Sequence, residues 1–247
     1  MSVFCPNCMA EIEEGTVCCP SCGGDTSIQN KPHQLPTYTI LNGRYIVGRS
    51  IGEGGFGITY VGYDLKLRAK VAIKEYFPAG SVTRTAETTV YVMDTSPESA
   101  FTLGKAKFVA ESQVLAQFLD EPNIVSVRDY FEENNTAYIV MEFLEGKSLH
   151  QMLKERGRLS VTEALEMTEP LMTALEKIHA HGLIHRDISP ANIMQLPDGR
   201  IKLLDFGAAR QYTDSEKSLS IILKPGYAAE EQYNKRGDQG PWSDVYA

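Results

Sequence analysis

The chain has 247 residues, which at about 150 residues per domain predicts one full domain and a smaller unit. Its 24 basic and 32 acidic residues give a net charge of −8, which argues against a nucleic-acid-binding surface built on bulk positive charge. A hydrophobic content of 43% is enough for a packed core, yet no apolar run reaches the roughly 18 residues of a membrane span. With no secretory signal evident, we expect a cytoplasmic chain with no membrane segment and no nucleic-acid partner.

The first motif is a pair of cysteine turns, Cys5-Pro-Asn-Cys8 and Cys19-Pro-Ser-Cys22. Each turn presents two thiolates, and two such turns offer four soft ligands in a tetrahedron, which suits Zn²⁺. A redox dithiol and an iron site are the alternatives. Cys18 is interpreted as a spare thiol, although exchange with Cys19 as a ligand stays open. No cysteine follows this motif, which fits a reducing compartment and a local metal site better than a disulfide scaffold.

This cysteine pattern resembles the zinc-ribbon modules found at the ends of many bacterial proteins. The resemblance implies a closed, structural metal site to which we assign no catalysis. We assign residues 1–25 to the ribbon. Residues 26–43 are polar and contain Pro32 and Pro36 as breakers, so they are predicted to form a linker.

A glycine-rich pattern, Gly52-x-Gly54-x-x-Gly57, comes next. Dinucleotide-binding folds share this pattern, but in those folds a helix opens after the glycines. Here residues 58–61 are β-branched and aromatic, which predicts a strand. A strand–glycine loop–strand hairpin can lay backbone amides over the phosphates of a nucleotide, because glycine has no Cβ to block the approach. An ordinary glycine-rich hairpin is the alternative.

A lysine and a glutamate form the next candidate pair. Lys74 ends a strand of buried type, residues 71–74, and becomes a candidate phosphate ligand because it follows the glycine loop. Such a lysine needs an anion to hold it, and Glu111 is the candidate, on a stretch with the three-and-four spacing of an amphipathic helix. Solvated side chains are the alternative for both. Residues 75–104 between them are longer than the connection needs, and no function is assigned to them.

Two further motifs complete the set. Residues 185–192 match the catalytic-loop pattern H-R-D-x-x-x-x-N, and residues 205–207 match D-F-G. With the glycine loop, strand lysine and helix glutamate in the same order, the chain resembles the eukaryotic-like serine/threonine protein kinases of bacteria. The resemblance covers residues 44–247 and implies an α+β, bilobal protein-kinase fold. It implies an antiparallel-sheet N-lobe with one main helix, about 44–141, and a mainly helical, incomplete C-lobe from about 145.

The resemblance also implies a role for each matched residue in ATP-dependent phosphoryl transfer to serine or threonine hydroxyls of protein substrates. Asp187 would orient the substrate hydroxyl and accept its proton. Lys74 would hold the α- and β-phosphates of ATP and be positioned by Glu111. Asn192 and Asp205 would bind Mg²⁺ or Mn²⁺, which neutralises charge on the transferring phosphoryl group.

Other residues would line the ATP site, and they come from the glycine loop, the following strands and a hinge at residues 141–144. The implied set is Ile51, Gly52, Gly54, Gly55, Gly57, Thr59, Ala72, Lys74, Met141, Glu142, Leu144, Asn192 and Asp205. Backbone groups of the hinge would read the adenine edge. For the apolar positions, ordinary core packing is an equally good description.

The scaffold before the catalytic loop carries a helix signal. Ser160-x-x-Glu163 is a capping box that predicts the start of an apolar-periodic helix ending near Gly182. Pro170 lies inside this stretch and should bend it. The helix would deliver the catalytic loop to its place.

Two positions depart from the family pattern. Ser189 stands where serine/threonine kinases usually carry a lysine that contacts the γ-phosphate, and Lys224 falls where a threonine beside that lysine is usual. We hypothesise a positional swap, in which the ammonium of Lys224 enters the space that Ser189 vacates. A charged donor at the developing phosphoryl charge lowers the barrier by an amount on the order of a few kcal/mol. The alternative is a solvated Lys224 and a weaker site.

The segment after D-F-G bears on regulation. Arg186 can pair with a phosphate on this segment and order it, with Thr213, Ser215, Ser218 and Ser220 as candidates. A segment ordered without modification is the alternative. Residues 242–247 resemble the start of the central helix of the large lobe, so the chain is expected to be a fragment of a longer kinase.

Three alternatives to a serine/threonine kinase stay open. The first is a non-catalytic ATP-binding or scaffolding module, such as a pseudokinase or an inactive fragment. The second is a small-molecule kinase of similar fold, which the peptide-platform-like segment before Glu231 disfavours. The third is tyrosine specificity, which the absence of the tyrosine-kinase catalytic-loop pattern disfavours.

Overall fold

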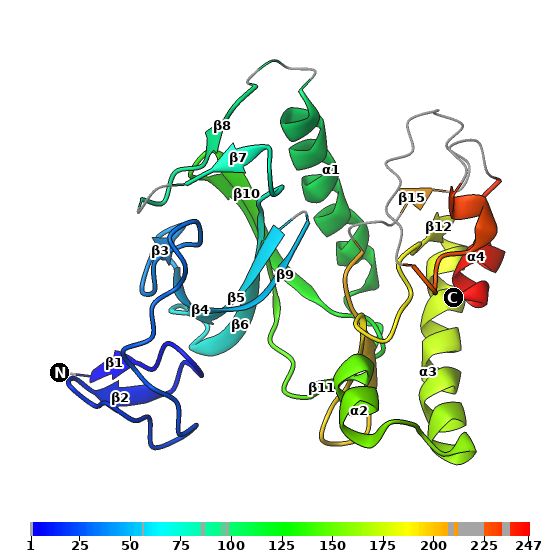
Figure 1. Ribbon diagram of the computed structural model, residues 1–247, viewed down its shortest axis with the longest axis horizontal. Coiled ribbons are helices and arrows are strands. Elements are labelled where there is room, and N and C mark those ends of the chain that lie inside the picture. Colours follow the sequence, from blue (N-terminus) through cyan, green and yellow to red (C-terminus); the bar gives the residue numbers. More distant parts are fainter. Residues whose placement is uncertain are drawn as a thin grey trace. The chain divides into compact units, whose positions relative to one another are not determined.

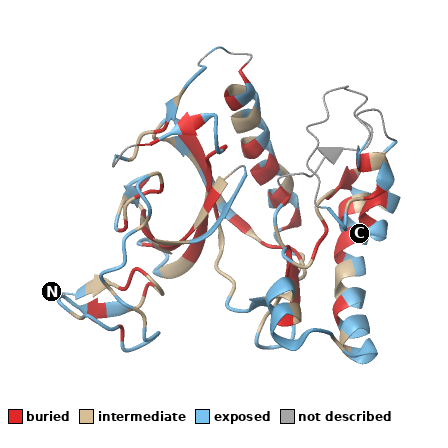
Figure 2. Cartoon of the chain, in the orientation of Figure 1, coloured by how far each residue is buried: buried red, intermediate tan, exposed pale blue. Residues whose placement is uncertain are grey.

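The computed structural model describes residues 2–55, 57–84, 87–94, 96, 99–206, 210–211, 225–233 and 238–247. The chain divides into two compact units. The N-terminal unit contains residues 1–116 and 126–143, and the C-terminal unit contains residues 117–125 and 144–247. Buried residues occur in the strands and helices of both units (Figure 2).

The N-terminal unit begins with the ribbon, a small hairpin of β1 (Ser2–Phe4) and β2 (Glu11–Glu13) (Figure 1). Its core consists of Cys5, Ile12 and Cys19, all buried, against which Cys8 packs. Even with Met9, which is also buried, this is a very small apolar core. A module of this size needs a metal or a disulfide to supply the rest of its stability.

A six-stranded antiparallel sheet forms the body of the N-terminal unit. Its strands in sheet order are β3 (Ile40–Leu41), β4 (Tyr45–Gly54), β5 (Gly57–Asp64), β6 (Ala69–Tyr76), β10 (Thr136–Glu142) and β9 (Val127–Glu133). The central strands are rich in β-branched and aromatic residues, which pack well on a pleated, buried surface. The strand predicted at residues 58–61 is confirmed as part of β5.

One main helix, α1 (Ala100–Leu115), packs against β9 and β10. Ser99 caps it by accepting a hydrogen bond from the backbone N–H of Thr102 at 3.1 Å. Phe101 and Phe108 of the helix are buried against the ring of Tyr76 of β6, with centroids 5.4 and 5.5 Å away. The antiparallel sheet with one main helix is therefore confirmed.

Two stretches without an assigned function also contribute strands. The predicted linker supplies β3, which pairs with β4 through Ile40–Ile46 and Leu41–Tyr45. The long connection after Lys74 holds a two-stranded ribbon of β7 (Val82–Thr83) and β8 (Tyr91–Val92).

The C-terminal unit combines helices with short strands. Its helices are α2 (Leu149–Arg156), α3 (Val161–Ala180) and α4 (Pro241–Tyr246), with a 3₁₀ helix η2 (Glu230–Tyr233). Another 3₁₀ helix, η1 (Ala116–Phe118), follows α1. One sheet contains β11 (Lys147–Ser148), β13 (Ile193–Gln195) and β14 (Ile201–Leu203), and a second pairs β12 (Leu183–Ile184) with β15 (Arg210–Gln211).

The capping box predicted for the long helix is confirmed. Ser160 Oγ accepts a hydrogen bond from Glu163 N at 3.2 Å, and Glu163 Oε2 accepts one from Ser160 N at 2.8 Å. The helix ends at Ala180, just before Gly182, and contains Pro170. None of the helices in the described part of the chain combines the length and the apolar character that crossing a membrane requires.

Candidate functional site

The glycine-rich hairpin joins β4 to β5, with Gly54 opposite Gly57. Gly57 leaves no room for a side chain, since a Cβ there would lie 2.4 Å from the carbonyl oxygen of Glu75. Gly52, Gly54 and Gly55 are exposed, and a Cβ on any of them would meet nothing within 4 Å. Their lack of a side chain therefore leaves the backbone of the hairpin open to a ligand rather than serving internal packing.

Lys74 and Glu111 lie together within the N-terminal unit. Lys74 is in β6, where it pairs with Thr59 of β5, and its Nζ lies 3.2 Å from Oε1 of Glu111 on α1. Both side chains are largely buried, at 15% and 6% exposure. The ring of Phe108, one helical turn before Glu111, lies 5.6 Å from the same ammonium. The helix thus fixes a cation beside the glycine-rich hairpin.

The residues expected around an adenine ring are distributed over both units. Ala72 of β6 is buried and pairs with Met141 of β10, which is half-buried. Glu142 donates its N–H to the carbonyl of Ser126 at 3.0 Å, so this N–H is already committed within the N-terminal unit. Ile51 is exposed on β4.

Leu144 begins the second stretch of the C-terminal unit and is half-buried. The expected hinge, residues 141–144, therefore spans the boundary between the units.

The catalytic-loop motif forms a tight hydrogen-bonded turn in the C-terminal unit. Asn192 Nδ2 donates to Asp187 twice, to Oδ2 at 2.7 Å and to the backbone carbonyl at 2.8 Å. Ser189, which is buried, accepts a hydrogen bond at its carbonyl from Asn192 N at 2.9 Å. These bonds hold one carboxylate oxygen of Asp187 in a fixed direction. An aspartate oriented in this way can accept a proton from a nearby hydroxyl.

The side chain of His185 contacts this turn through hydrogen bonds. Its ring is fully buried, accepts a hydrogen bond at Nδ1 from Asp187 N at 3.3 Å, and donates from Nε2 to the carbonyl of Leu204 at 3.0 Å. One donor and one acceptor are what a neutral imidazole offers. Burial lowers the pKa of His185, despite the opposing influence of the Asp244 carboxylate, so the neutral form is favoured.

The β13–β14 hairpin brings Asn192 and Asp205 to the same place. Asn192 directly precedes β13, and Asp205 follows β14 by two residues. Because the strands are antiparallel, these two ends meet, and Leu204 N donates to the carbonyl of Asn192 at 2.8 Å. Asp205 is exposed and has a left-handed backbone with φ of 57°. A carboxylate and an amide oxygen at one hairpin end are hard ligands that suit Mg²⁺.

Asp244 of α4 is a functional residue that the sequence analysis missed. Its buried carboxylate accepts hydrogen bonds from the backbone N–H of His185 at 2.8 Å and of Arg186 at 2.7 Å. Arg186 has a left-handed backbone with φ of 68°, a conformation that is costly for a residue with a side chain. The two bonds stabilise that conformation, and with it the place of Asp187. The signal was present in residues 242–247, which were interpreted only as the start of a helix.

Of the remaining predicted residues, the structure describes Glu231 but not the others. Glu231 accepts a hydrogen bond from Ser243 Oγ. Gly207 and Lys224 lie outside the described residues, as do the candidate phosphorylation sites Thr213, Ser215, Ser218 and Ser220.

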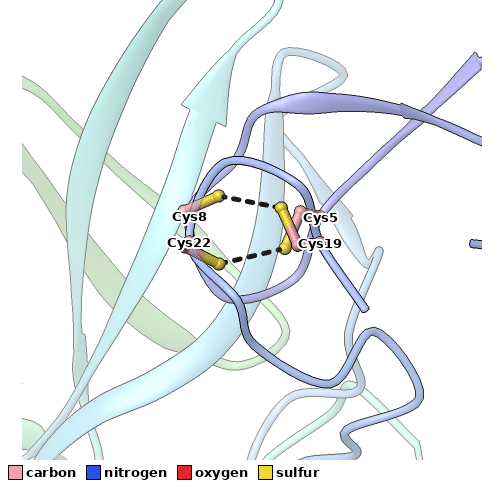
Figure 3. A group of neighbouring side chains, drawn as sticks. All are labelled: Cys5, Cys8, Cys19 and Cys22. Atoms are coloured by element: carbon pink, nitrogen blue, oxygen red, sulfur yellow. Dashed lines mark hydrogen bonds between the residues drawn. The ribbon is translucent and has the colours of Figure 1, made fainter. Parts of the chain in front are cut away.

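The four cysteines of the two turns converge in the ribbon (Figure 3). Their sulfur atoms all lie within 4.8 Å of one another, with Cys8–Cys19 at 3.7 Å and Cys5–Cys22 at 3.9 Å. These distances exclude disulfides, whose S–S bond is about 2.05 Å. A tetrahedron with Zn–S bonds of about 2.3 Å has sulfurs about 3.8 Å apart, so the donor set fits Zn²⁺.

The clustering of the four thiols changes their acidities. Burial, together with the neighbouring thiols, raises the pKa of Cys8 to about 12. Burial would also raise the pKa of Cys19, but backbone N–H groups of Cys22 and Ser21 outweigh it and lower this pKa to about 6. Four thiolates this close repel one another, and a divalent cation removes that cost. Cys18 is exposed and is not part of the cluster.

Comparisons with known proteins agree with the geometry of each unit. Residues 45–247 match the family described as protein kinase domain. The chain is 36% identical over 214 residues to the serine/threonine-protein kinase PknA of Mycobacterium tuberculosis, covering 84% of this chain and 45% of that protein. It is 28% identical over 260 residues to the serine/threonine-protein kinase B of Synechocystis sp., covering 99% of this chain and 40% of that protein.

A solved structure, "PpkA-294 apo form", aligns with a TM-score of 0.74 at 33% identity. The alignment covers 87% of this chain and 75% of that one. The chain spans less than half the length of the two curated relatives named above.

Proposed function

Since this chain belongs to the protein kinase domain family, we propose that it transfers the γ-phosphoryl group of ATP to serine or threonine hydroxyls of protein substrates. The relatives that it resembles carry the name serine/threonine-protein kinase, which supports this choice of acceptor. The observation that carries the proposal is the set of polar groups for phosphoryl transfer that the two units hold. The Lys74–Glu111 pair lies in one unit, and the Asp187–Asn192 turn with the neighbouring Asp205 lies in the other.

Each group has a chemical task in this proposal. Lys74, held by Glu111, would bind the α- and β-phosphates below the open backbone of the glycine-rich hairpin. Asp187 would orient the acceptor hydroxyl and take its proton, with its carboxylate oriented by the hydrogen bond from Asn192. Asn192 and Asp205 would hold Mg²⁺. When bound, this ion would neutralise charge on the transferring phosphoryl group.

Two further assignments belong to the proposal. The four thiolates of Cys5, Cys8, Cys19 and Cys22 would hold a structural Zn²⁺, which their spacing supports. Lys224 would supply a charged donor to the γ-phosphoryl group, in compensation for Ser189, as the sequence pattern suggests.

Phosphoryl transfer to a generic protein acceptor tests the proposal. The full chain is incubated with Mg²⁺, ATP labelled at the γ-phosphate, and casein, and the labelled amino acids are identified. The proposal expects label on serine and threonine. Asp187→Asn should slow transfer by about 100-fold or more, because general-base catalysis contributes about that much. Lys224→Ala should slow it by about 100- to 1000-fold, the usual cost of losing a donor to developing negative charge.

The binding of ATP separates the outcomes. ATP affinity should change little in the Asp187→Asn protein, since this residue acts on the acceptor hydroxyl. A wild-type chain that binds ATP without transferring label would favour a non-catalytic ATP-binding module. Equal transfer rates in wild type and Asp187→Asn would reject the assignment of the catalytic base.

A further inference from the structure

The segment between the ribbon and the sheet lies as a strap against the glycine-rich hairpin. The strap is defined here as residues 30–37, and its Leu35 is fully buried. Asn30 Nδ2 donates to the carbonyl of Gly48 at 2.9 Å, and Asn30 Oδ1 accepts from Ser50 N at 2.8 Å, both on β4. Leu35 N donates to the hydroxyl of Tyr60 on β5 at 3.0 Å. The strap is therefore bonded to both strands of the hairpin.

Three strap side chains converge on the carboxylate of Glu53, which lies between Gly52 and Gly54. Lys31 Nζ lies 3.2 Å from Oε2, His33 Nε2 lies 2.8 Å from Oε1, and Gln34 Nε2 donates to Oε2 at 2.9 Å. We call these contacts the clasp. Burial would raise the pKa of Glu53, but the bonds from His33 and Lys31 outweigh it and lower this pKa. The carboxylate is thus charged at neutral pH and is held from three directions.

Buried residues hold His33 of the clasp in place. Arg84, which is fully buried, donates from Nη1 to the carbonyl of His33 at 3.2 Å. The ring of His33 also lies 6.0 Å from the ring of Phe77. At the tip of the hairpin, Ala79 N donates to the carbonyl of Gly55 at 3.2 Å. Both Arg84 and Ala79 come from the long connection after Lys74, which therefore contributes to holding the hairpin tip.

The ion pairs of the clasp are too weak to matter for global stability, but they can affect the order of the hairpin. The side chains of Lys31, His33 and Glu53 are 67%, 36% and 35% exposed, and ion pairs this exposed add little to global stability. A glycine-rich segment, however, has an unusually large conformational freedom, so ordering it is costly. A weak contact at its tip can therefore change how much of that cost remains when a ligand binds.

We propose that Lys31, His33 and Gln34 are positioning residues that act through Glu53 to hold the glycine-rich hairpin in its phosphate-binding shape before the nucleotide arrives. This inference rests on the proposed function for the identity of the ligand, a nucleoside triphosphate. The ordering of the hairpin itself does not depend on that identity.

Hydrogen exchange of the full chain without nucleotide tests the ordering directly. The variants are Lys31→Ala/His33→Ala, and Glu53→Gln, which leaves the strap sequence intact if the first variant folds poorly. Amides of residues 50–55 should exchange about three- to tenfold faster in both, because a weakened contact raises the population of opened hairpin. Lys147→Ala is the matched control, since it removes another exposed lysine ion pair, with Glu155, in the C-terminal unit. It should leave exchange at residues 50–55 unchanged.

Nucleotide affinity and turnover test the consequence. The dissociation constant of Mg²⁺–ATP should rise about three- to tenfold in both variants, as preorganisation is lost. The turnover number at saturating ATP should stay within about twofold, because bound nucleotide restores the hairpin. When Lys31→Ala/His33→Ala is combined with Glu53→Gln, the dissociation constant should rise little further than in either variant alone, since both variants weaken the same contact.

The outcomes discriminate between the two proposals. Unchanged exchange at residues 50–55 in both variants would overturn the clasp, and so would faster exchange with unchanged ATP affinity. A wild-type chain that binds no ATP would reject the proposed function, and the exchange experiment would then still decide whether the clasp orders the hairpin.

Discussion

Replacement of Arg84 with methionine should destabilise the N-terminal unit strongly, because it leaves a buried carboxylate without its cation. The side chains of Arg84 and Glu75 are both fully buried. The Glu75 carboxylate accepts hydrogen bonds from two guanidinium nitrogens of Arg84 and from the hydroxyls of Tyr60 at 2.9 Å and Tyr138 at 3.0 Å. Arg84 also donates to the carbonyls of Thr88 and His33.

The expected loss is about 3–5 kcal/mol in the free energy of unfolding, the usual cost of removing one partner of a buried ion pair. The two tyrosine hydroxyls remain on Glu75 and keep the loss within this range. Adding Glu75→Gln should recover about 1–2 kcal/mol, since the amide oxygen still accepts from the hydroxyls and no charge is left buried. Lys147→Met, which breaks an exposed pair, should cost about 1 kcal/mol or less.

Urea denaturation measures these differences. Far-ultraviolet circular dichroism follows the whole chain, whereas the fluorescence of Trp242, the one tryptophan of the sequence, follows the C-terminal unit. The Arg84→Met transition should shift mainly in the dichroism signal. A cost below about 1 kcal/mol, or a double variant less stable than Arg84→Met alone, would refute the reasoning.

Two further predictions concern the other unit and the ribbon. Lowering the pH from 7.5 to 5.5 should destabilise the C-terminal unit, because burial depresses the pKa of His185 and the unfolded chain, with a histidine pKa of about 6.5, takes up the proton first. The urea midpoint followed by Trp242 fluorescence should fall as the pH is lowered through this window. The dependence of this midpoint on pH should be weaker in His185→Asn and unchanged in His150→Asn, which alters an exposed histidine. An equal pH dependence in the wild type and both variants would contradict the assignment. Cys19→Ser should abolish bound zinc and lower the thermal midpoint, whereas Cys18→Ser should change neither. Metal analysis and a melting curve decide this, and full zinc occupancy in the Cys19→Ser protein would count against the site.

The elements that the sequence predicted carry local signals. The capping box at Ser160 and Glu163 defines the start of α3, and the β-branched run after Gly57 defines β5. The two-residue strands β11 and β12 carry no such signal, because they exist through pairing with distant partners. Sequence periodicity reports on a residue and its near neighbours, so these strands could not be predicted from it.

In the candidate site, too, some residues could be predicted from sequence motifs and others could not. Lys74 and Glu111 are 37 positions apart, and their proximity followed from the order of the motifs rather than from either residue alone. Asp244 was missed because the partners that tie it to the catalytic loop are backbone amides, which leave no trace in side-chain composition. The strap was interpreted as a linker because its prolines and polar residues are typical of one. Its contacts with Ser50 and Glu53 are about twenty positions away and are not encoded by local composition.

The dependence of the catalytic loop on Asp244 has a consequence for biosynthesis. The carboxylate that stabilises the backbone of Arg186 is 58 positions further along the chain. At translation rates of about 5–20 residues per second, the ribosome needs about 3–12 s to supply it. During that interval the nascent loop lacks the Asp244 carboxylate. Asp187 can therefore reach its oriented position only some time after the loop itself has been synthesised.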